Sequence, residues 1–415
     1  MNKLPSDWQI KTINEVCNIY TGNSINKKKK EENFIGLKEG LNYIGTKDIS
    51  FNNIIEYENG VKIPFKDLKD FKIAKSNTSL LCIEGGSAGR KIGFTNQDVC
   101  FGNKLCCFEA IEDEPKFIYF YLQSNDFLRE FNSNIQGLIG GVNKENLRKI
   151  KIPIPPLDEQ KRIASALSKI DAYLENTIKL IEEKERFKRG IAKKLLTCKE
   201  GENIPEARFK GFEDEWEIVK LGDITKMISG GTPNTKIKEY YNGNIVWATI
   251  TDITNSYKYL YDSEKKITEL GLQNSSTKIF PINTVLYSIY GSIGECAISK
   301  VECTTNQAIL GIECSDKINY NFLYYLLSNH KNNAKKLRQF GTQPNINKKI
   351  VLNFCFKIPN IEEQEKIGEY LSLLDAEIDN LKKQKELIKE MKRGAMQKLL
   401  SGEVRLSKNA FNENI

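Results

Sequence analysis

A 43-residue segment that occurs twice constrains the fold of this chain more than any other feature. Residues 155–197 and 359–401 align without a gap at a constant offset of 204, and 17 of the 43 paired positions are identical. Repeat units of solenoid proteins are roughly 20–50 residues long, so a period near 200 residues indicates a duplicated domain instead. The sequence therefore predicts two domains, each followed by one copy of this segment.

Each copy of the segment has the pattern of a long helix. Apolar residues recur at 3–4 spacing, as at Ile163 and Leu167 in the first copy and Ile367 and Leu371 in the second. Such a stripe is wide enough for one partner helix, and about forty helical residues extend roughly 60 Å. Because each helix leaves its own domain in the same relation, two equivalent helices that pack together must run antiparallel about a pseudo-two-fold axis. We expect them to act as a rigid spacer that holds the two domains at its opposite ends.

The duplication also covers the domains. Trp8 matches Trp216 and Gly22 matches Gly230, both at an offset of 208. Short apolar runs separated by polar turns predict strands in both halves, and an aromatic-rich core helix follows each set. The fold class expected is α+β: two tandem α/β domains with mixed or antiparallel sheets, separated by two long helices in an antiparallel coiled coil. The boundaries expected are 1–154 and 201–358 for the domains, 155–200 and 359–402 for the helices, and 403–415 for a C-terminal tail.

Composition bounds the class of protein. The 415 residues are 40% hydrophobic and 28% charged, with a formal charge of +8. This balance is typical of a globular protein and permits nucleic-acid binding without requiring it. No apolar run approaches the ~20 residues that span a bilayer, and the first residues lack a signal-peptide pattern. The sequence therefore predicts a cytoplasmic protein that does not associate with a membrane.

Cysteine and histidine usage argues against a metal site. The ten cysteines show no Cys-x-x-Cys spacing, which predicts reduced thiols and no metal ligands. The only histidine, His330, is expected to be a solvated residue in a turn after an apolar helix. The run from Lys27 to Lys30 is expected to form a solvated loop that could add salt-dependent affinity for phosphate.

No catalytic motif is evident. The chain lacks a Gly-x-x-x-x-Gly-Lys-Ser/Thr phosphate loop, a strand-led Gly-x-Gly-x-x-Gly, and the Asn/Asp-Pro-Pro-aromatic motif of an amino-methyltransferase. We therefore expect no catalytic residue in this chain. What remains is binding chemistry in both domains, because glycine-flanked polar loops can approach a phosphate backbone and offer donors to base edges. The candidate DNA contacts are Thr46, Lys47, Ser87, Arg90, Lys91, Asn103 and Lys104 in the first domain and Thr249, Thr251, Tyr290, Ser292, Thr305, Asn306 and Gln307 in the second.

At this point the residues resemble a known family. Residues 229–233 (Ser-Gly-Gly-Thr-Pro), 240–247, 251–253 and 305–309 are similar to the target-recognition domain of type I restriction–modification specificity subunits, the HsdS family. The Pro-x-Leu/Ile-Asp/Glu-Glu-Gln start of each long helix is that family's other signature. The first domain departs from the pattern because it lacks the Gly-Thr-Pro and Tyr-Tyr-x-Gly segments.

The resemblance implies a non-catalytic subunit in which each domain reads one half of a split site in double-stranded DNA. The helix pair would set the spacer and dock two copies of an adenine-N6 methyltransferase subunit, which flips the target base. A separate ATP-dependent restriction subunit would cut unmodified DNA. S-adenosylmethionine, ATP and Mg would then be bound by the partners, and no cofactor by this chain. The helix residues assigned to spacing and partner binding are Glu159, Gln160, Leu167, Lys188, Glu363, Gln364, Leu371 and Lys392.

Two other functions remain open on the residues alone. A structural adaptor could use the same coiled coil to join two protein-binding domains. An enzyme with an unfamiliar site would methylate or cleave DNA by itself. Sequence-selective, salt-dependent DNA binding distinguishes the first of these from a DNA-recognition subunit.

Overall fold

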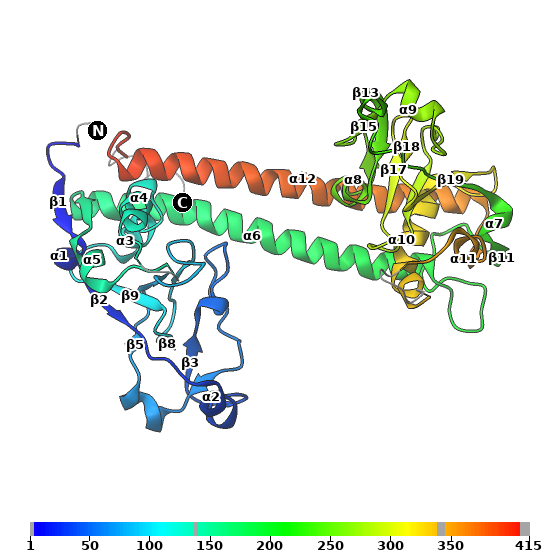
Figure 1. Ribbon diagram of the computed structural model, residues 1–415. Helices are drawn as coiled ribbons and strands as arrows, with labels where there is room; N and C mark the ends of the chain where they lie inside the picture. Colours follow the sequence, from blue (N-terminus) through cyan, green and yellow to red (C-terminus); the bar gives the residue numbers. More distant parts are fainter. Residues whose placement is uncertain (1–3, 137–139, 338–344, 407–415) are drawn as a thin grey trace. The chain divides into compact units, whose positions relative to one another are not determined.

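The computed structural model describes residues 4–136, 140–337 and 345–406. Its contacts divide the chain into two compact units (Figure 1). Unit 1 comprises residues 1–178 and 384–415, and unit 2 comprises residues 179–383. Each unit contains one sheet-rich domain and one segment of each long helix, α6 (Leu157–Leu196) and α12 (Ile361–Leu400). The predicted tail is described only as far as Leu406.

Unit 1 is built on mixed and antiparallel sheets. One sheet has the strand order β2-β9-β6-β7, a second has β4-β3-β8-β5, and β1 pairs with β10. Strands β3 and β8 are parallel, and the other pairs are antiparallel. The strands are β1 (Gln9–Thr12), β2 (Cys17–Thr21), β3 (Leu41–Ile44), β4 (Lys62–Ile63), β5 (Ile73–Ala74), β6 (Ser79–Cys82), β7 (Ile92–Phe94), β8 (Val99–Phe101), β9 (Leu105–Ala110) and β10 (Lys151–Ile154). The helices are α1 (Ile13–Val16), α2 (Lys27–Asn33), η1 (Thr46–Asp48), η2 (Phe65–Asp70), α3 (Pro115–Tyr121), α4 (Asn125–Ser133) and α5 (Lys144–Lys149).

Unit 2 repeats this plan. Its sheets have the orders β12-β19-β16-β17-β14 and β15-β13-β18, and β11 pairs with β20. Strands β13 and β18 are parallel, like β3 and β8. The strands are β11 (Glu217–Lys220), β12 (Thr225–Ser229), β13 (Tyr241–Ala248), β14 (Tyr259–Leu260), β15 (Lys266–Ile267), β16 (Val285–Ser288), β17 (Cys296–Ser299), β18 (Thr304–Thr305), β19 (Ile309–Cys314) and β20 (Cys355–Ile358). The helices are α7 (Leu221–Ile224), η3 (Lys238–Tyr240), α8 (Ile250–Asn255), α9 (Glu269–Gln273), α10 (Tyr320–Lys336) and α11 (Lys348–Leu352).

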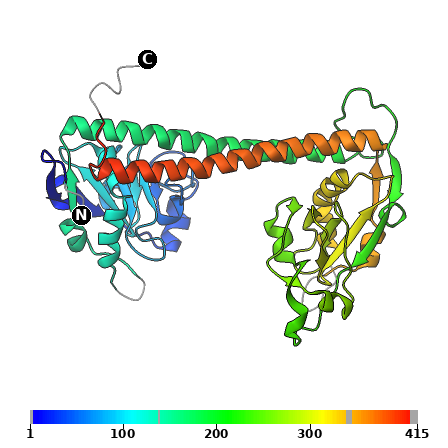
Figure 2. The ribbon, with the colours of Figure 1, turned by 90° about the horizontal axis from the view of Figure 1, so that it is seen from above.

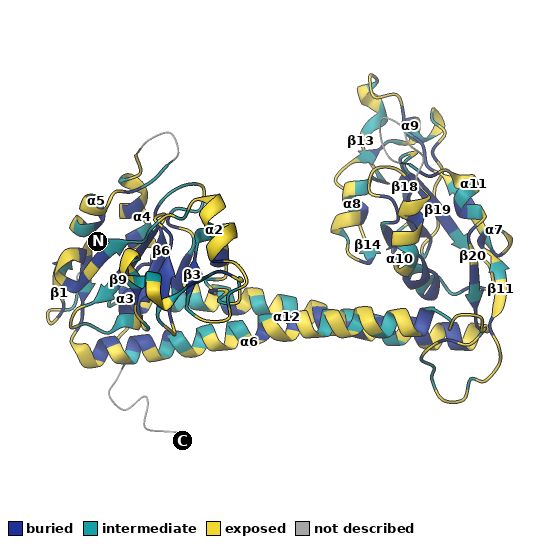
Figure 3. Cartoon of the chain, turned by 90° about the horizontal axis from the view of Figure 1, so that it is seen from below, coloured by how far each residue is buried: buried dark blue, intermediate teal, exposed yellow. Residues whose placement is uncertain are grey.

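In each unit, segments of α6 and α12 lie side by side and run antiparallel (Figures 1 and 2). In unit 1 the side chain of Asp171 pairs with Lys392, and Tyr173 bonds Gln384, so residue numbers rise along one helix as they fall along the other. In unit 2 Lys184 pairs with Glu377 and Lys188 with Asp375 in the same sense. Buried and exposed residues alternate along both helices (Figure 3). The predicted α+β class with an antiparallel helix pair is confirmed.

The helices belong to the domain cores. In unit 1 Ile163 and Leu167 of α6 and Leu399 of α12 join the same buried cluster as Trp8 and the rings of α3. In unit 2 the C-terminal part of α6 and the N-terminal part of α12 contribute in the same way. Leu195 and Leu371 belong to the buried cluster that contains Trp216. Burial of apolar surface therefore fastens each domain to both helices.

Four local predictions are wrong in detail. His330 lies inside α10, half-buried against the rings of Phe354 and Phe356 at 4.9 and 5.0 Å, and this burial lowers its pKa. The lysines from residue 27 to 30 form the first turn of α2, which Asn26 caps, instead of a loop. The apolar run at residues 245–250 predicts a strand over its whole length, but the strand ends at Ala248 and Ile250 begins α8. The run at residues 150–153 predicts a strand that ends at its proline, but β10 continues through Pro153 to Ile154, which an edge strand tolerates.

Candidate nucleic-acid interface

One glycine in each domain brings two loops into close contact. A Cβ atom on Gly22 would overlap the carbonyl oxygen of Phe101, and one on Gly230 would overlap Thr305. These equivalent approaches join the end of β2 to β8 and the end of β12 to β18. The repeated glycines therefore shape the loop cluster at the ends of the parallel strands.

In unit 1 three predicted loops meet at one edge of the sheets. Because β3 and β8 are parallel, the loops that follow them leave at the same end, and the N–H of Gly102 donates to the carbonyl oxygen of Ile44 at 2.9 Å. Lys91 Nζ donates to the carbonyl oxygen of Thr46 at 3.0 Å. The N–H of Ile83 donates to the carbonyl oxygen of Lys104 at 3.0 Å. The exposed candidates here are Lys47, Arg90, Asn103 and Lys104, whereas Thr46, Ser87 and Lys91 are half-buried.

Unit 2 brings together the equivalent loops. The N–H of Asn306 donates to the carbonyl oxygen of Ala248 at 3.2 Å, and that of Ile289 donates to the carbonyl oxygen of Ala308 at 2.9 Å. Thr249 is half-buried, and its hydroxyl donates to Asp252 at 2.6 Å, which holds the first turn of α8. The exposed candidates are Thr251, Tyr290, Ser292 and Gln307, and Asn306 is half-buried.

Thr305 differs from the expectation. Its side chain is fully buried under the glycine-rich loop, so it lies in the domain interior and not on an exposed loop. Two further motif residues are structural in the same way. Trp247 donates its ring N–H to the carbonyl oxygen of Gly231 at 3.0 Å, and Tyr241 donates to that of Pro233 at 2.6 Å. The sequence could not separate Thr305 from loop-surface residues, because it stands directly beside Asn306 and Gln307 in a polar run.

Phe51 is a residue that the sequence did not single out. It is 64% exposed, and its ring lies 5.6 Å from the Arg90 guanidinium and 4.9 Å from Lys91 Nζ. Stacking on an aromatic face holds these cations in place. Phe51 and Arg90 also line an open cleft of about 1390 Å³ within unit 1, together with Arg129, Lys149, Lys151 and Arg393. This part of unit 1 is therefore basic and hollowed.

The assigned helix residues lie mostly inside their units. Glu159 and Glu363 are each 1% exposed, as are the adjacent glutamines. Gln160 accepts from the N–H of Glu114, and Gln364 accepts from the N–H of Asn319, both at 2.9 Å. Leu167 and Leu371 have no exposed surface. These residues fasten each helix start to the domain that precedes it.

Buried carboxylates at equivalent positions each bind an arginine. Arg208 donates to Glu363 through Nε at 2.9 Å and through a terminal nitrogen at 2.8 Å, and these bonds raise the arginine pKa. Arg405 binds Glu159 and Asp7 in unit 1. Trp8 also donates its ring N–H to Glu159 at 3.2 Å. Each arginine follows the C-terminal end of one long helix and binds a glutamate near the start of the other. The two units therefore have equivalent arginine–glutamate contacts.

The described part of the chain also bears on metal binding, on cysteine chemistry and on membrane spanning. No group of three or more His, Cys, Asp or Glu side chains among those residues could hold a metal ion. All ten cysteines are free thiols, and burial raises the pKa of most of them, to about 12 for Cys296. Across residues 4–136, 140–337 and 345–406, no helix is long and apolar enough to cross a bilayer.

Comparisons with known proteins agree with the duplication. A family model described as the type I restriction modification DNA specificity domain matches residues 5–183 and again residues 213–390. The MjaVIII type I restriction enzyme specificity subunit of Methanocaldococcus jannaschii is 28% identical over 435 aligned residues, which cover 99% of this chain and 96% of that protein. The EcoBI specificity subunit of Escherichia coli is 24% identical over 403 residues, covering 91% and 81%.

Solved structures share the fold. The S subunit of a type I restriction–modification system from M. genitalium superimposes with a TM-score of 0.61 at 17% identity, over 96% of this chain and 97% of that one. A chain from a study of type I system assembly gives a TM-score of 0.60 over 97% and 100%. With two family matches that together span most of its length, the chain belongs to the type I restriction–modification DNA specificity family.

Proposed function

We propose that each unit reads one half of a bipartite site in double-stranded DNA, through the loop cluster at the ends of its parallel strands. The observation that carries this proposal is the duplicated cluster itself: two domains of the same plan present polar loops at the same edge, on a chain of the specificity family. In this proposal the chain supplies sequence specificity and no catalytic step. S-adenosylmethionine, ATP and Mg bind the partner subunits, and the complex works in the cytoplasm.

Unit 1 offers the clearest test of DNA binding. Arg90→Ala combined with Lys104→Ala should lower affinity for a cognate duplex and reduce the slope of log K against log salt by about 0.9 for each phosphate that is no longer neutralised. The measurement is fluorescence anisotropy of the chain assembled with its methyltransferase subunit, at several salt concentrations. Lys66→Ala with Lys69→Ala is the matched control, since these residues are exposed in η2 of the same unit, away from the cluster.

The same titration tests one alternative: binding that is neither sequence-selective nor dependent on salt would favour the structural adaptor. A separate assay of the chain alone tests the other, since methylation or cleavage of DNA by it would favour an enzyme with an unfamiliar site.

We also propose that the helix pair sets the gap between the half-sites and docks two methyltransferase subunits. Each helix has 40 residues and contributes to both units. The assigned glutamates, glutamines and leucines serve this role by holding the helices in place. Phe187 of α6 and Met391 of α12 offer contact surface, since both are 52% exposed and they are equivalent at the offset of 204 (187 + 204 = 391).

Substituting these two residues should remove partner subunits one at a time. Phe187→Glu and Met391→Glu are each expected to weaken one docking site by about 30-fold, the effect of losing about 2 kcal/mol at an apolar contact. Native mass spectrometry of the assembled complex should show one methyltransferase subunit for each single variant and none for the double variant. Leu373→Lys is the control: Leu373 is 65% exposed, and its equivalent is already Lys169. Full occupancy in the double variant would contradict the proposed docking surface.

A further inference from the structure

An ion pair joins α6 to α12 at the same place in each unit. In unit 2 it is Lys188 with Asp375, and in unit 1 it is Lys392 with Asp171 at 2.6 Å. The two pairs are copies of each other, since 188 + 204 = 392 and 171 + 204 = 375. All four side chains are at most 27% exposed. A paired charge retained at one point of an apolar seam favours a single helix register.

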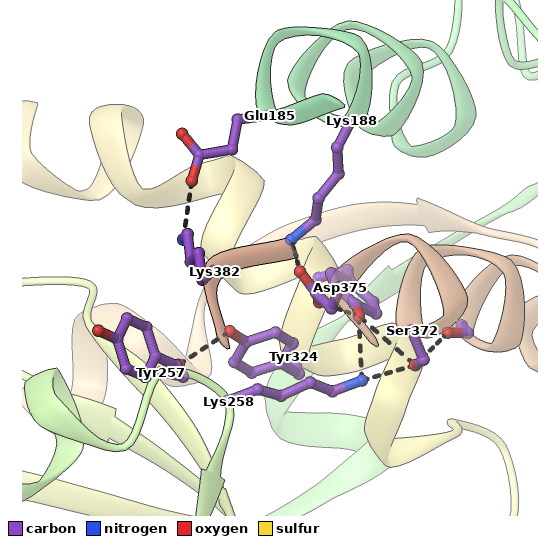
Figure 4. A network of polar contacts seen from close by, with 10 residues as sticks. Glu185, Lys188, Tyr257, Lys258, Tyr324, Ser372, Asp375 and Lys382 are labelled. Carbon is purple, nitrogen blue, oxygen red and sulfur yellow. Dashed lines mark hydrogen bonds and ion pairs between the residues drawn. The ribbon is translucent and has the colours of Figure 1, made fainter. Parts of the chain in front are cut away.

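In unit 2 this pair is connected to the recognition domain through Lys258 (Figure 4). The Tyr325 hydroxyl of α10 donates to Asp375. Lys258 Nζ donates to that hydroxyl at 3.0 Å and to Ser372 Oγ of α12 at 2.6 Å. Lys258 is 6% exposed, and its Nζ lies 4.5–5.5 Å from the ring centroids of Tyr259, Tyr324 and Tyr325. Burial lowers its pKa to about 8.

Unit 1 makes the equivalent connection with different residues. Gln123, which follows α3, accepts from Lys392 Nζ at 3.1 Å and from Asn53 Nδ2 at 2.9 Å. Asn53 has φ 64 and is the equivalent of Tyr257, which has φ 55 (53 + 204 = 257). Asn53 and Tyr257 therefore end equivalent loops in the two units, and Lys258 comes directly after Tyr257.

These loops also carry candidate DNA contacts. In unit 1 the loop that ends at Asn53 begins with Thr46 and Lys47 and includes Phe51. In unit 2 it begins with Thr249, which caps α8, and Thr251, which lies in α8. One end of each loop thus lies in the recognition surface and the other end is bonded to the helix pair. Apolar packing alone is non-directional, whereas hydrogen bonds through three elements specify an orientation.

We propose that Lys258 and Gln123 are positioning residues, each of which holds the DNA-reading loop of its own unit against the α6–α12 pair. This inference rests on the proposed function. Neither residue needs to touch DNA. Each acts by keeping the loop of its unit at one distance from the helices, so that the side chains of the loop meet base edges in one geometry. Readout of the half-site belonging to that unit depends on it.

Lys258→Met separates positioning from stability. Methionine has a similar length and removes the buried charge, and the groups it leaves keep partners: Tyr325 bonds Asp375, and Ser372 donates to the carbonyl oxygen of Gly368 at 2.6 Å. Removing the Lys258 ammonium relieves the cost of burying it, and Asp375 keeps Lys188 as its ion-pair partner, so no buried charge is left unpaired and the unfolding midpoint should not fall. Discrimination against single-base changes in one half-site should nevertheless drop about tenfold.

The matched control is Lys300→Met. Lys300 Nζ also lies over the Tyr259 ring, at 4.9 Å, but it donates to Asn283 at 2.7 Å instead of to α12. Discrimination of the Lys300→Met variant against single-base changes should stay at the wild-type level. In unit 1 Gln123→Met removes the shared acceptor and should relax the other half-site, whereas Gln123→Glu keeps an acceptor oxygen and should retain discrimination.

The measurement is methylation of duplexes with single-base changes in either half-site, by the chain assembled with its methyltransferase subunits, alongside thermal unfolding. Wild-type discrimination in both Lys258→Met and Gln123→Met would overturn the positioning role. Equal loss in both half-sites, or loss that follows a lowered unfolding midpoint, would overturn it as well. A wild-type complex without sequence selectivity would instead overturn the proposed function, so the two failures are distinguishable.

Discussion

Replacing residues 17–143 with the equivalent segment of another type I specificity subunit is expected to change one half of the methylated sequence and to leave the other half and the gap unchanged. These residues contain every candidate contact of unit 1, from β2 to the turn before α5. The replacement keeps β1, α1, α5 and β10, because β1 pairs with β10 and the N–H of Ile13 donates to the carbonyl oxygen of Ile150 at 2.9 Å. Long-read detection of N6-methyladenine in DNA modified by the assembled complex gives the result directly.

The duplication supplies the matched experiment. Replacing residues 225–347, which run from β12 to the turn before α11, should change only the other half of the sequence. An exchange that altered both halves together, or neither, would contradict independent reading by the two units. The gap serves as an internal check, since neither exchange alters α6 or α12.

Glu363→Ala is expected to destabilise unit 2 by about 3–5 kcal/mol, the usual cost of breaking a buried ion pair from one side. Glu363 is 1% exposed and Arg208 is 13% exposed, so the arginine would lose both charge-assisted bonds without gaining full hydration. Arg208 would keep its bond to the carbonyl oxygen of Asp214, at 2.6 Å. Urea unfolding followed by tryptophan fluorescence is suitable, because Trp216 and Trp247 both lie in unit 2.

Two variants make this prediction specific. Glu159→Ala should cost less than Glu363→Ala, because Arg405 is 44% exposed and retains two bonds to Asp7. Glu365→Ala, at an exposed position on the same turn of α12, should change the free energy of unfolding by less than about 0.5 kcal/mol. A loss of less than about 1 kcal/mol in the free energy of unfolding for Glu363→Ala would mean that the ion pair does not hold the segment between α6 and β11 to α12.

The sequence alone was sufficient for features that depend on repetition and periodicity. An offset that stays at 204 over 43 residues predicts two equal domains, and apolar 3–4 spacing predicts the helices that follow them. The matched tryptophans near the start of the two domains predict core anchors, and Trp8 and Trp216 are indeed buried, with 7% and 2% exposure. Local periodicity reports which face of an element is buried, which is why these predictions hold.

Local patterns were insufficient where two classes of residue share one neighbourhood. Thr305 stands beside Asn306 and Gln307 in a loop-like sequence, yet only its side chain points into the interior. His330 reads as part of a polar turn, but α10 continues past it because two phenylalanine rings from the segment before α12 cover it. Both outcomes depend on contacts from distant parts of the chain, which spacing along the sequence does not report.

The same division applies to the long helices. Their existence, their duplication and their antiparallel direction follow from sequence and connectivity. The ion pairs of Lys188 and Lys392 do not: each of these lysines binds an aspartate of the neighbouring helix, and spacing along the sequence does not predict that contact. Only the tertiary structure places Lys258 and Gln123 next to those pairs, since hydrogen bonds between elements far apart in sequence form only when the packed domains bring them within about 3 Å.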